Sequence, residues 1–211
     1  MTNTITVTLG GMLIASVMFT TPAAASSPVD LANPAFAPVT GPTSIPVGAA
    51  DFCKRDTQVC RPNGHVVEVE ALTQASWSQL IAVNDQVNAT IIPETDEDNY
   101  HLVEFWSYPT DGRGDCEDIA LQKQKQLIAD GWDPSALLMT VVRERDGNGH
   151  AVLMVRTDRG DLILDNQNGK VLLWKDTNYE FVKRQSQADA GKWVGLNDDR
   201  ATIMATATTG N

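Results

Sequence analysis

The order of the predicted elements constrains the fold most, because helical periodicity comes first and short strand patterns follow it. Apolar side chains recur at three- and four-residue steps over residues 73–89, and this spacing predicts a helix that Thr73 or Ser76 caps. A second helix is predicted over residues 116–130, where Gly131 ends it. Strands are predicted over residues 136–144, 150–157, 161–165, 171–174 and 179–184. This order is typical of an α+β domain whose helices pack on an antiparallel sheet.

The first 25 residues predict export. They contain no charged side chain, and their apolar stretch is followed by Ala23, Ala24 and Ala25, which match the small-x-small pattern of a signal-peptide cleavage site. No Lys or Arg precedes the apolar stretch, so an uncleaved membrane anchor is the alternative interpretation. We expect residues 1–25 to be a signal peptide and the mature protein to be periplasmic or secreted.

The rest of the 211-residue chain fits a single domain. Residues 26–48 are rich in Pro, Ala, Thr and Ser, which predicts a flexible linker or an extended wrap and not a core element. We expect the ordered domain over residues 49–197. The polar residues 198–211 contain few large apolar groups and predict a frayed tail.

The charge of the chain excludes one class of partner. The formal net charge is −11 at pH 7, and no run of basic residues occurs. Nucleic-acid binding needs clustered Lys and Arg side chains for phosphate contacts, so the composition argues against it. Solubility is the simplest explanation of the acidity, and a cation site or a basic partner is the alternative.

The three cysteines divide into a close pair and a single residue. Cys53 and Cys60 lie near each other in the sequence, and in an exported chain such a pair favours a disulfide over a metal site. A loop this short stabilises the fold by roughly 2 to 3 kcal/mol in the chain-entropy model. Cys116 then has no partner within the chain. An odd cysteine in an oxidising compartment is a free reactive thiol or forms an intermolecular link.

Cys116 occupies a position that suits a nucleophile. It begins the predicted helix directly after the glycine-rich residues 111–115. The partial positive charge and unpaired N–H groups of a helix N-terminus favour a thiolate there, and the same groups can hold the oxyanion of a tetrahedral intermediate. The sequence therefore predicts a reactive cysteine at this helix start.

His150 and Asp165 are the predicted partners of that cysteine. His150 begins one strand and Asp165 ends the next, and a turn at residues 158–160 joins them. In an antiparallel pair the start of one strand lies opposite the end of the other, so the two side chains should be neighbours. The aspartate can then hold one imidazole nitrogen and leave the other facing the thiol of Cys116. Taken singly, each residue also has a structural interpretation, and His101 is a competing base that lacks a matching carboxylate.

Several segments together resemble one family. They are Gly114-Asp115-Cys116-Glu117-Asp118 with its apolar helix, Gly149-His150-Ala151-Val152-Leu153, Leu164-Asp165-Asn166, residues 179–186, and the segment from Phe52-Cys53 to Cys60. Over residues 52–193 the chain resembles the bacterial transglutaminase-like cysteine proteinases. The resemblance implies a papain-like transglutaminase core. It also implies that Cys116 is the nucleophile, His150 the base and Asp165 the residue that orients the base.

The resemblance also implies a calcium site. In related proteins the acidic residues that flank the cysteine bind Ca²⁺, and here these are Asp115 and Glu117, with Asp118 as a weaker candidate. The alternative is that these acids only favour the helix N-terminus. Two carboxylates beside Cys116 would raise the pKa of the thiol unless a cation or His150 offsets them.

The expected function is hydrolysis of a peptide bond through a thioester intermediate. By resemblance, the substrate is an envelope or surface protein such as a biofilm adhesin, and a membrane receptor acts as an inhibitory partner. One alternative is a transglutaminase or amidase that uses the same triad. A catalytically silent binding module on the same scaffold is the other.

Overall fold

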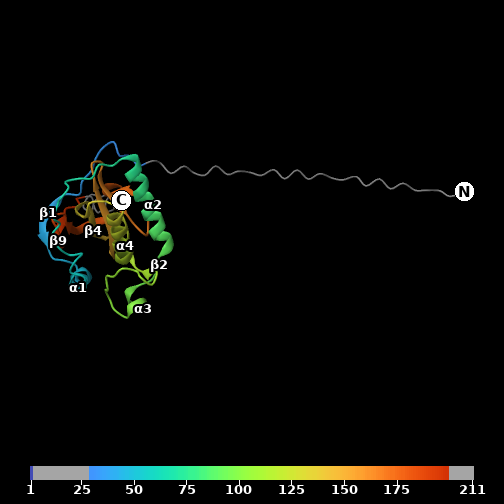
Figure 1. The fold of residues 1–211 in the computed structure, drawn as a ribbon, viewed down its shortest axis with the longest axis horizontal. Coiled ribbons are helices and arrows are strands. Elements are labelled where there is room, and N and C mark those ends of the chain that lie inside the picture. Colours follow the sequence, from blue (N-terminus) through green and yellow to red (C-terminus); the bar gives the residue numbers. More distant parts are fainter. Residues whose placement is uncertain (2–28, 200–211) are drawn as a thin grey trace, which may run out of the picture.

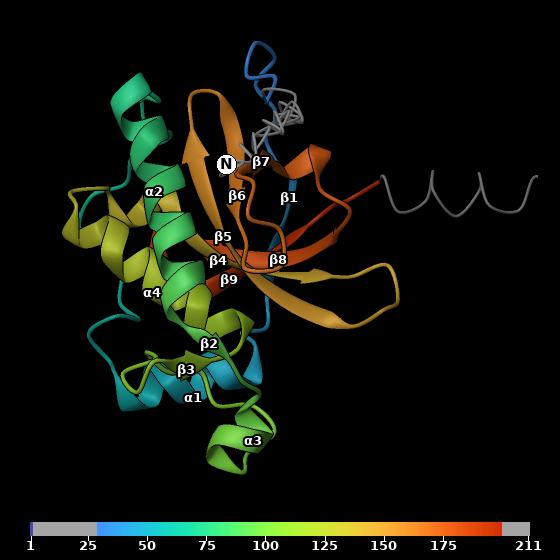
Figure 2. The ribbon, with the colours of Figure 1, turned by 90° about the vertical axis from the view of Figure 1, so that its right-hand side faces the viewer.

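Helices lie against one face of a seven-stranded sheet in the computed structural model, which describes residue 1 and residues 29–199 (Figure 1 and Figure 2). The helices are α1 (Val47–Arg55), α2 (Gln74–Thr90), α3 (Asp96–Tyr100) and α4 (Cys116–Ala129), with 3-10 turns η1 (Pro134–Ala136) and η2 (Trp174–Asp176). Helix α4 packs directly on the central strands, and α2 packs on α4. Within residues 29–199, no helix combines the length and the apolar composition that a membrane span requires.

The large sheet is antiparallel throughout. Its strands are β1 (Val39–Thr43), β4 (Leu137–Arg143), β5 (Gly149–Thr157), β6 (Gly160–Leu164), β7 (Leu172–Leu173), β8 (Glu180–Ser186) and β9 (Asp189–Leu196). They are ordered β1-β9-β8-β4-β5-β6-β7, and each neighbouring pair is antiparallel. A separate parallel pair consists of β2 (Ile92–Pro93) and β3 (Arg113–Gly114), and β3 directly precedes α4. The α+β prediction, with helices on an antiparallel sheet, is therefore confirmed.

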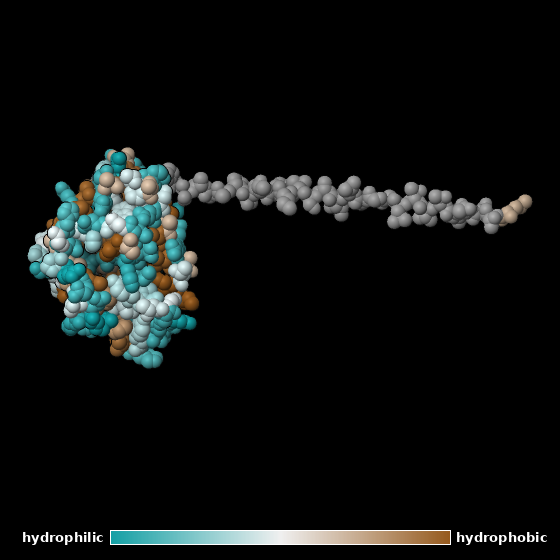
Figure 3. Space-filling model, viewed as in Figure 1, coloured by the Kyte–Doolittle hydropathy of each residue, from teal (hydrophilic) through white to brown (hydrophobic). Residues whose placement is uncertain are grey.

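Apolar side chains fill both faces of the sheet. On the helix side, Leu80 of α2 and Leu127 of α4 are fully buried in one cluster with Leu153 of β5. On the opposite face, Trp174 and Phe181 pack edge to face with ring centroids 5.5 Å apart. Burying one such side chain contributes roughly 1.5 to 3 kcal/mol. Polar surface predominates on the face in Figure 3, where apolar side chains are scattered.

Local sequence signals place the two long helices correctly. Thr73 caps α2, and its hydroxyl accepts from the N–H of Ser76 while the Ser76 hydroxyl accepts from the N–H of Thr73. This reciprocal capping box satisfies two N–H groups that a helix start leaves unpaired. Helix α4 begins at Cys116, as the sequence predicts, and Gly131 follows its end with φ of +98°. Glycine adopts that left-handed conformation at little cost.

The linker predicted over residues 26–48 is wrong for its second half. Residues 39–43 form β1, which pairs with β9 at the edge of the sheet, and α1 begins at Val47. Most of the β1 side chains are exposed, so its sequence lacks the apolar alternation that marks a half-buried strand. Backbone pairing with β9 stabilises it. The expectation of an extended wrap agrees with this edge position.

Two further elements carry weak sequence signals. Strand β9 contains Gly191 and Gly195, which dilute its strand pattern, yet a Cβ at Gly195 would lie only 2.5 Å from Oγ1 of Thr40. Glycine at this position therefore leaves room for the Thr40 side chain of β1. Helix α3 forms in a short acidic segment, because Thr95 caps it and three acids occupy its first turn.

Both predicted terminal segments lie largely outside the described residues. Residues 2–28 include nearly all of the predicted signal peptide, and residues 200–211 include most of the predicted tail. Asp198 is described, and its carboxylate accepts a 2.9 Å hydrogen bond from the N–H of Phe181. The chain is therefore still attached to β8 at the first residue of the predicted tail.

A disulfide joins Cys53 of α1 to Cys60, as the sequence predicts. Their Cα atoms are 5.3 Å apart, within the usual range for this bond. From the last turn of α1, Arg55 donates a 2.7 Å hydrogen bond to the carbonyl of Trp106. The cross-linked helix therefore supports the segment that leads to α4.

Candidate active site

Cys116 is the first residue of α4, and the preceding loop is fixed by its backbone. The N–H of Ile92 donates to the carbonyl of Gly112 at 2.9 Å, and the N–H of Glu94 donates to Gly114 at 3.1 Å. A Cβ at Gly114 would lie 2.7 Å from the Asp118 side chain, so the loop approaches the helix as only glycine permits. These contacts hold the thiol at the helix N-terminus.

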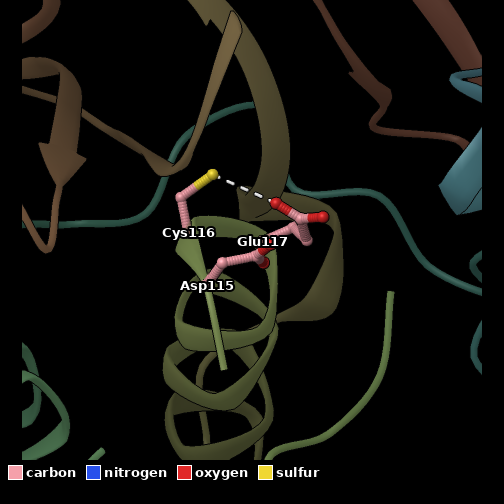
Figure 4. Close-up of side chains that lie close together, drawn as sticks. All are labelled: Asp115, Cys116 and Glu117. Atoms are coloured by element: carbon pink, nitrogen blue, oxygen red, sulfur yellow. Dashed lines mark hydrogen bonds between the residues drawn. The ribbon is translucent and has the colours of Figure 1, made fainter. Parts of the chain in front are cut away.

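The thiol of Cys116 has an acidic partner. Its sulfur donates a 3.0 Å hydrogen bond to Oε2 of Glu117 (Figure 4). Burial and the neighbouring Glu117 carboxylate raise the pKa of the thiol well above its usual value. The backbone N–H of Ala151, which follows His150 on β5, lies close enough to the sulfur to act in the opposite direction on this pKa. The structure therefore places the sulfur beside β5 and holds it as a thiol.

His150 and Asp165 form a buried pair. Nε2 of His150 lies 2.9 Å from Oδ1 of Asp165, and both side chains are almost fully inaccessible to solvent. Two more donors reach the carboxylate, namely the Tyr179 hydroxyl at 2.5 Å and the Gln167 N–H at 3.0 Å. Burial opposes ionisation of Asp165, but the hydrogen bonds from His150 and Tyr179 outweigh it and hold the pKa of this carboxyl below its usual value.

Strand register explains this pairing. In the β5–β6 ladder Leu153 is opposite Leu164, so Asp165 lies just beyond the last pair on the same edge as the start of β5. Gln167 follows in that loop, and its Nε2 lies 3.5 Å from Nδ1 of His150. An ionised Asp165 accepts from Nε2–H, which leaves Nδ1 as the acceptor nitrogen of a neutral ring.

A cluster of buried acids surrounds the start of α4. Carboxylate oxygens of Asp96, Asp115 and Asp118 lie within 4.8 Å of one another, and Asp115, Glu117 and the Cys116 sulfur form a second such group. Burial, followed by the charge of Asp115, raises the pKa of Glu117 to about 9. Burial also raises the pKa of Asp118 to about 8, although Asp118 accepts a hydrogen bond from a backbone N–H. The cluster therefore needs protons or a cation at neutral pH.

Two oxygens of this cluster are unpartnered. Oδ1 of Asp96 and Oδ1 of Asp115 are buried and accept no hydrogen bond from any residue that the structure describes. Buried carboxylate oxygens without donors are costly unless a cation coordinates them. Their arrangement fits a hard cation that prefers oxygen ligands, such as Ca²⁺ or Mg²⁺.

Without added divalent cations, we expect the free energy of unfolding to fall as pH rises from 5 to 7. The folded-state pKa values of Glu117 and Asp118 are raised to about 9 and about 8, so the folded state binds more protons than the unfolded state in this window. Stability is greatest below the unfolded pKa values and is lost as pH rises toward the folded ones. The loss should be on the order of a few kcal/mol, measured by urea unfolding in EGTA.

The double variant Glu117→Gln, Asp118→Asn is the control for this pH dependence. It removes both ionisations, so its stability should change much less over the same range. Above about pH 7 the wild-type loss becomes less steep, because burial lowers the pKa of Lys123 to about 7 and its deprotonation partly opposes the trend. A flat wild-type profile would contradict the buried-acid interpretation.

The structure brings some candidates together and separates others. Asp115 and Glu117 lie next to the thiol as the sequence predicts, and Asp118 belongs to the second acidic group. His101 is exposed at the end of α3, where its Nδ1 lies 3.2 Å from the Glu97 carbonyl oxygen and does not pair with Asp165. Sequence reasoning missed Asp96 and the role of Tyr179. Neither lies near Cys116 or Asp165 in the chain, so only tertiary structure identifies them.

Comparisons with known proteins agree with this geometry. A sequence model of the family described as bacterial transglutaminase-like cysteine proteinase matches residues 39–201. Calcium-bound LapG of Legionella pneumophila is similar in structure, with a TM-score of 0.50 and 25% identity over 63% of this chain and 80% of that protein. EGTA-treated LapG of the same organism gives a TM-score of 0.48 and 26% identity over 63% and 76%. No curated protein sequence matches the chain.

Proposed function

Because the chain belongs to the bacterial transglutaminase-like cysteine proteinase family and is therefore a cysteine peptidase, we propose that Cys116, His150 and Asp165 are its catalytic triad. The observation that carries this proposal is the buried His150–Asp165 pair, whose 2.9 Å hydrogen bond leaves Nδ1 of the ring as an acceptor. The proximity of the Ala151 N–H to the Cys116 sulfur supports it, since Ala151 directly follows His150.

In the proposed reaction, the sulfur of Cys116 attacks the carbonyl carbon of the scissile peptide bond, and its proton passes to Nδ1 of His150. Negative charge develops on the carbonyl oxygen, where backbone N–H groups at the start of α4 stabilise it. His150 returns the proton to the leaving amine, and the acyl group remains on the sulfur as a thioester. Water then gives a proton to His150 and attacks the thioester carbon. The carbon–sulfur bond breaks, His150 passes its proton to the sulfur, and a carboxylic acid and the free thiol are released.

Calcium belongs to this proposal. Asp115 and Glu117 would hold Ca²⁺, with Asp96 and Asp118 adjacent, because these acids are buried together and two of their oxygens lack donors among the described residues. A bound Ca²⁺ supplies positive charge that offsets the carboxylates beside the thiol. Positive charge held by Asp115 and Glu117 would lie beside the Cys116 sulfur and would favour its thiolate form. The calcium-bound state of LapG supports this assignment.

We propose that the enzyme is exported and acts on a protein of the cell envelope or surface, such as an adhesin, under an inhibitory membrane receptor. The predicted signal peptide over residues 1–25 supports export. The Cys53–Cys60 disulfide supports it independently, since such bonds persist in oxidising compartments. A peptidase family implies a protein substrate.

The proposed hydrolysis predicts new N-termini in envelope proteins. Wild-type enzyme is incubated with an envelope extract, Ca²⁺ and a labelled primary amine, and the products are read by mass spectrometry. We expect cleaved chains with new N-termini and no labelled amine in the proteins, because water accepts the acyl group. Amine incorporation without chain cleavage would identify a transglutaminase that uses the same triad. Absence of both products, with an unreactive Cys116 toward iodoacetamide, would favour a binding module.

A further inference from the structure

Asp165 is held by more groups than a strand end requires. It lies one residue beyond β6, in the loop that also carries Gln167, and only 3% of its surface is exposed. A carboxylate that orients a catalytic imidazole must itself be fixed, because a small displacement changes the direction of the ring nitrogen. Two residues outside the proposed triad hold Asp165: Tyr179, which directly precedes β8, and Asn88 of α2.

Tyr179 fixes the carboxylate of Asp165. Its hydroxyl donates a 2.5 Å hydrogen bond to Oδ2, the oxygen that His150 does not use. Its ring also lies 5.3 Å from the His150 ring, centroid to centroid. Burial and the Asp165 charge raise the pKa of Tyr179, so the hydroxyl stays protonated and remains a donor. One side chain therefore touches both members of the buried pair.

Asn88 fixes the backbone of Asp165. Its Nδ2 donates a 2.8 Å hydrogen bond to the Asp165 carbonyl, and Asn84, one turn earlier on α2, donates a 3.0 Å hydrogen bond to the Gly169 carbonyl. Residues four apart lie on the same helix face, so the two amides clamp both ends of one loop. Oδ1 of each asparagine is buried and has no partner among the described residues. Stability alone does not favour such atoms.

We propose that Tyr179 and Asn88 are positioning residues of the peptidase, which fix the carboxylate and the backbone of Asp165 so that Nδ1 of His150 stays aimed at the thiol. The proposal rests on the proposed triad. It explains why Asn88 is present although its Oδ1 has no partner among the described residues: the side-chain N–H group is needed to hold the active-site loop. It also explains why the sequence carries a tyrosine, and not a phenylalanine, directly before β8.

Tyr179→Phe tests the first contact, with Tyr108→Phe as the matched control because the Tyr108 ring packs on Phe52. We expect the cleavage rate at saturating substrate and Ca²⁺ to fall about tenfold in Tyr179→Phe, since one hydrogen bond to a charged group is lost. Tyr108→Phe should stay within twofold of wild type. Thermal unfolding of each variant measures its folded fraction.

An NMR signature separates positioning from folding. The Nε2–H proton of His150 should resonate at low field while Asp165 is ionised, and the His150→Gln spectrum assigns it. Asp165 loses a donor in Tyr179→Phe, so its pKa rises and the signal should disappear at a pH about one unit higher than in wild type. An unchanged signal and an unchanged rate would overturn the proposal, and so would a slower rate with an unchanged signal.

Asn88→Ala keeps the proposal testable if Tyr179→Phe does not fold. Alanine favours the helix and removes the unpartnered oxygen, so stability should hold or rise while the cleavage rate falls about tenfold. Asn84→Ala, which releases the loop at Gly169 instead, should have a smaller effect on rate. Equal rates in wild type and Asn88→Ala would overturn this contact. Activity that survives in a Cys116→Ala variant would instead overturn the triad itself, so the two failures are distinguishable.

Discussion

Cys116→Ala is expected to abolish peptide-bond cleavage while the fold stays intact. No thioester can form without the sulfur, and loss of a catalytic nucleophile commonly costs about 10⁴-fold or more in rate. The side chain is half-buried at the first position of α4, and its hydrogen bond to Glu117 is not a core contact. Alanine also favours the helix. Cleavage of envelope proteins and thermal unfolding, measured on the same preparation, test both parts of this prediction.

The control variant replaces the other two cysteines. A Cys53→Ser, Cys60→Ser variant loses the disulfide that closes the end of α1 but keeps the thiol of Cys116. We expect it to lose roughly 2 to 3 kcal/mol of stability and to retain cleavage at temperatures where it is folded. Iodoacetamide should label wild type at Cys116 alone, because it is the free cysteine of the chain. Turnover by purified Cys116→Ala at the wild-type rate would remove Cys116 from the mechanism.

The parts of the site that follow from sequence are those set by local rules. A glycine-rich turn before an amphipathic helix places Cys116 at a helix start, since helix boundaries depend on nearby residues. His150 and Asp165 could be paired because one turn joins their strands, and the length of that hairpin fixes which residues meet. No contact across the fold was needed for either inference.

The remaining parts depend on contacts that no local pattern encodes. Asp96 lies in a segment that reads as an acidic loop, and it reaches the start of α4 only after the chain folds back. Strand β1 pairs with β9, which lies at the other end of the domain in the sequence. No local pattern in β1 indicates this pairing, so its residues resemble a linker. Tyr179 directly precedes β8, which pairs with β4 and β9 and not with β6. Their roles require tertiary structure.

Glu117 connects the acidic cluster to the chemistry. Its carboxyl group accepts a hydrogen bond from the Cys116 thiol, and it belongs with Asp115 to a group of ligand atoms that could hold a cation. The carboxyl group of Glu117 cannot interact at full strength with the Cys116 thiol and with a cation at the same time. A cation on Glu117 weakens its hold on the thiol, and a protonated thiol on Glu117 weakens cation binding. The cluster is therefore coupled to the ionisation of the proposed nucleophile.

Chelation with EGTA is expected to reduce cleavage by about 100-fold or more, and added Ca²⁺ is expected to restore it. Without the cation, burial and Glu117 keep the Cys116 thiol protonated, since its pKa is well above the usual value. Mg²⁺ should restore little, because it demands a tighter octahedral site and dehydrates reluctantly. Ca²⁺ at 100 times its dissociation constant should add about 2.7 kcal/mol of stability, which raises Tm by roughly 5 to 10 °C.

Variants at the two ends of α4 locate this effect. Asp115→Asn at the helix start should weaken the Tm increase by Ca²⁺, because it replaces a carboxylate of the cluster with a neutral amide. Asp130→Asn at the other end changes an acid of the same helix that lies outside the cluster, and it should respond to Ca²⁺ as wild type does. Full cleavage by wild type in excess EGTA would remove calcium from the mechanism. A Tm increase that persists in Asp115→Asn would place the cation elsewhere on the molecule.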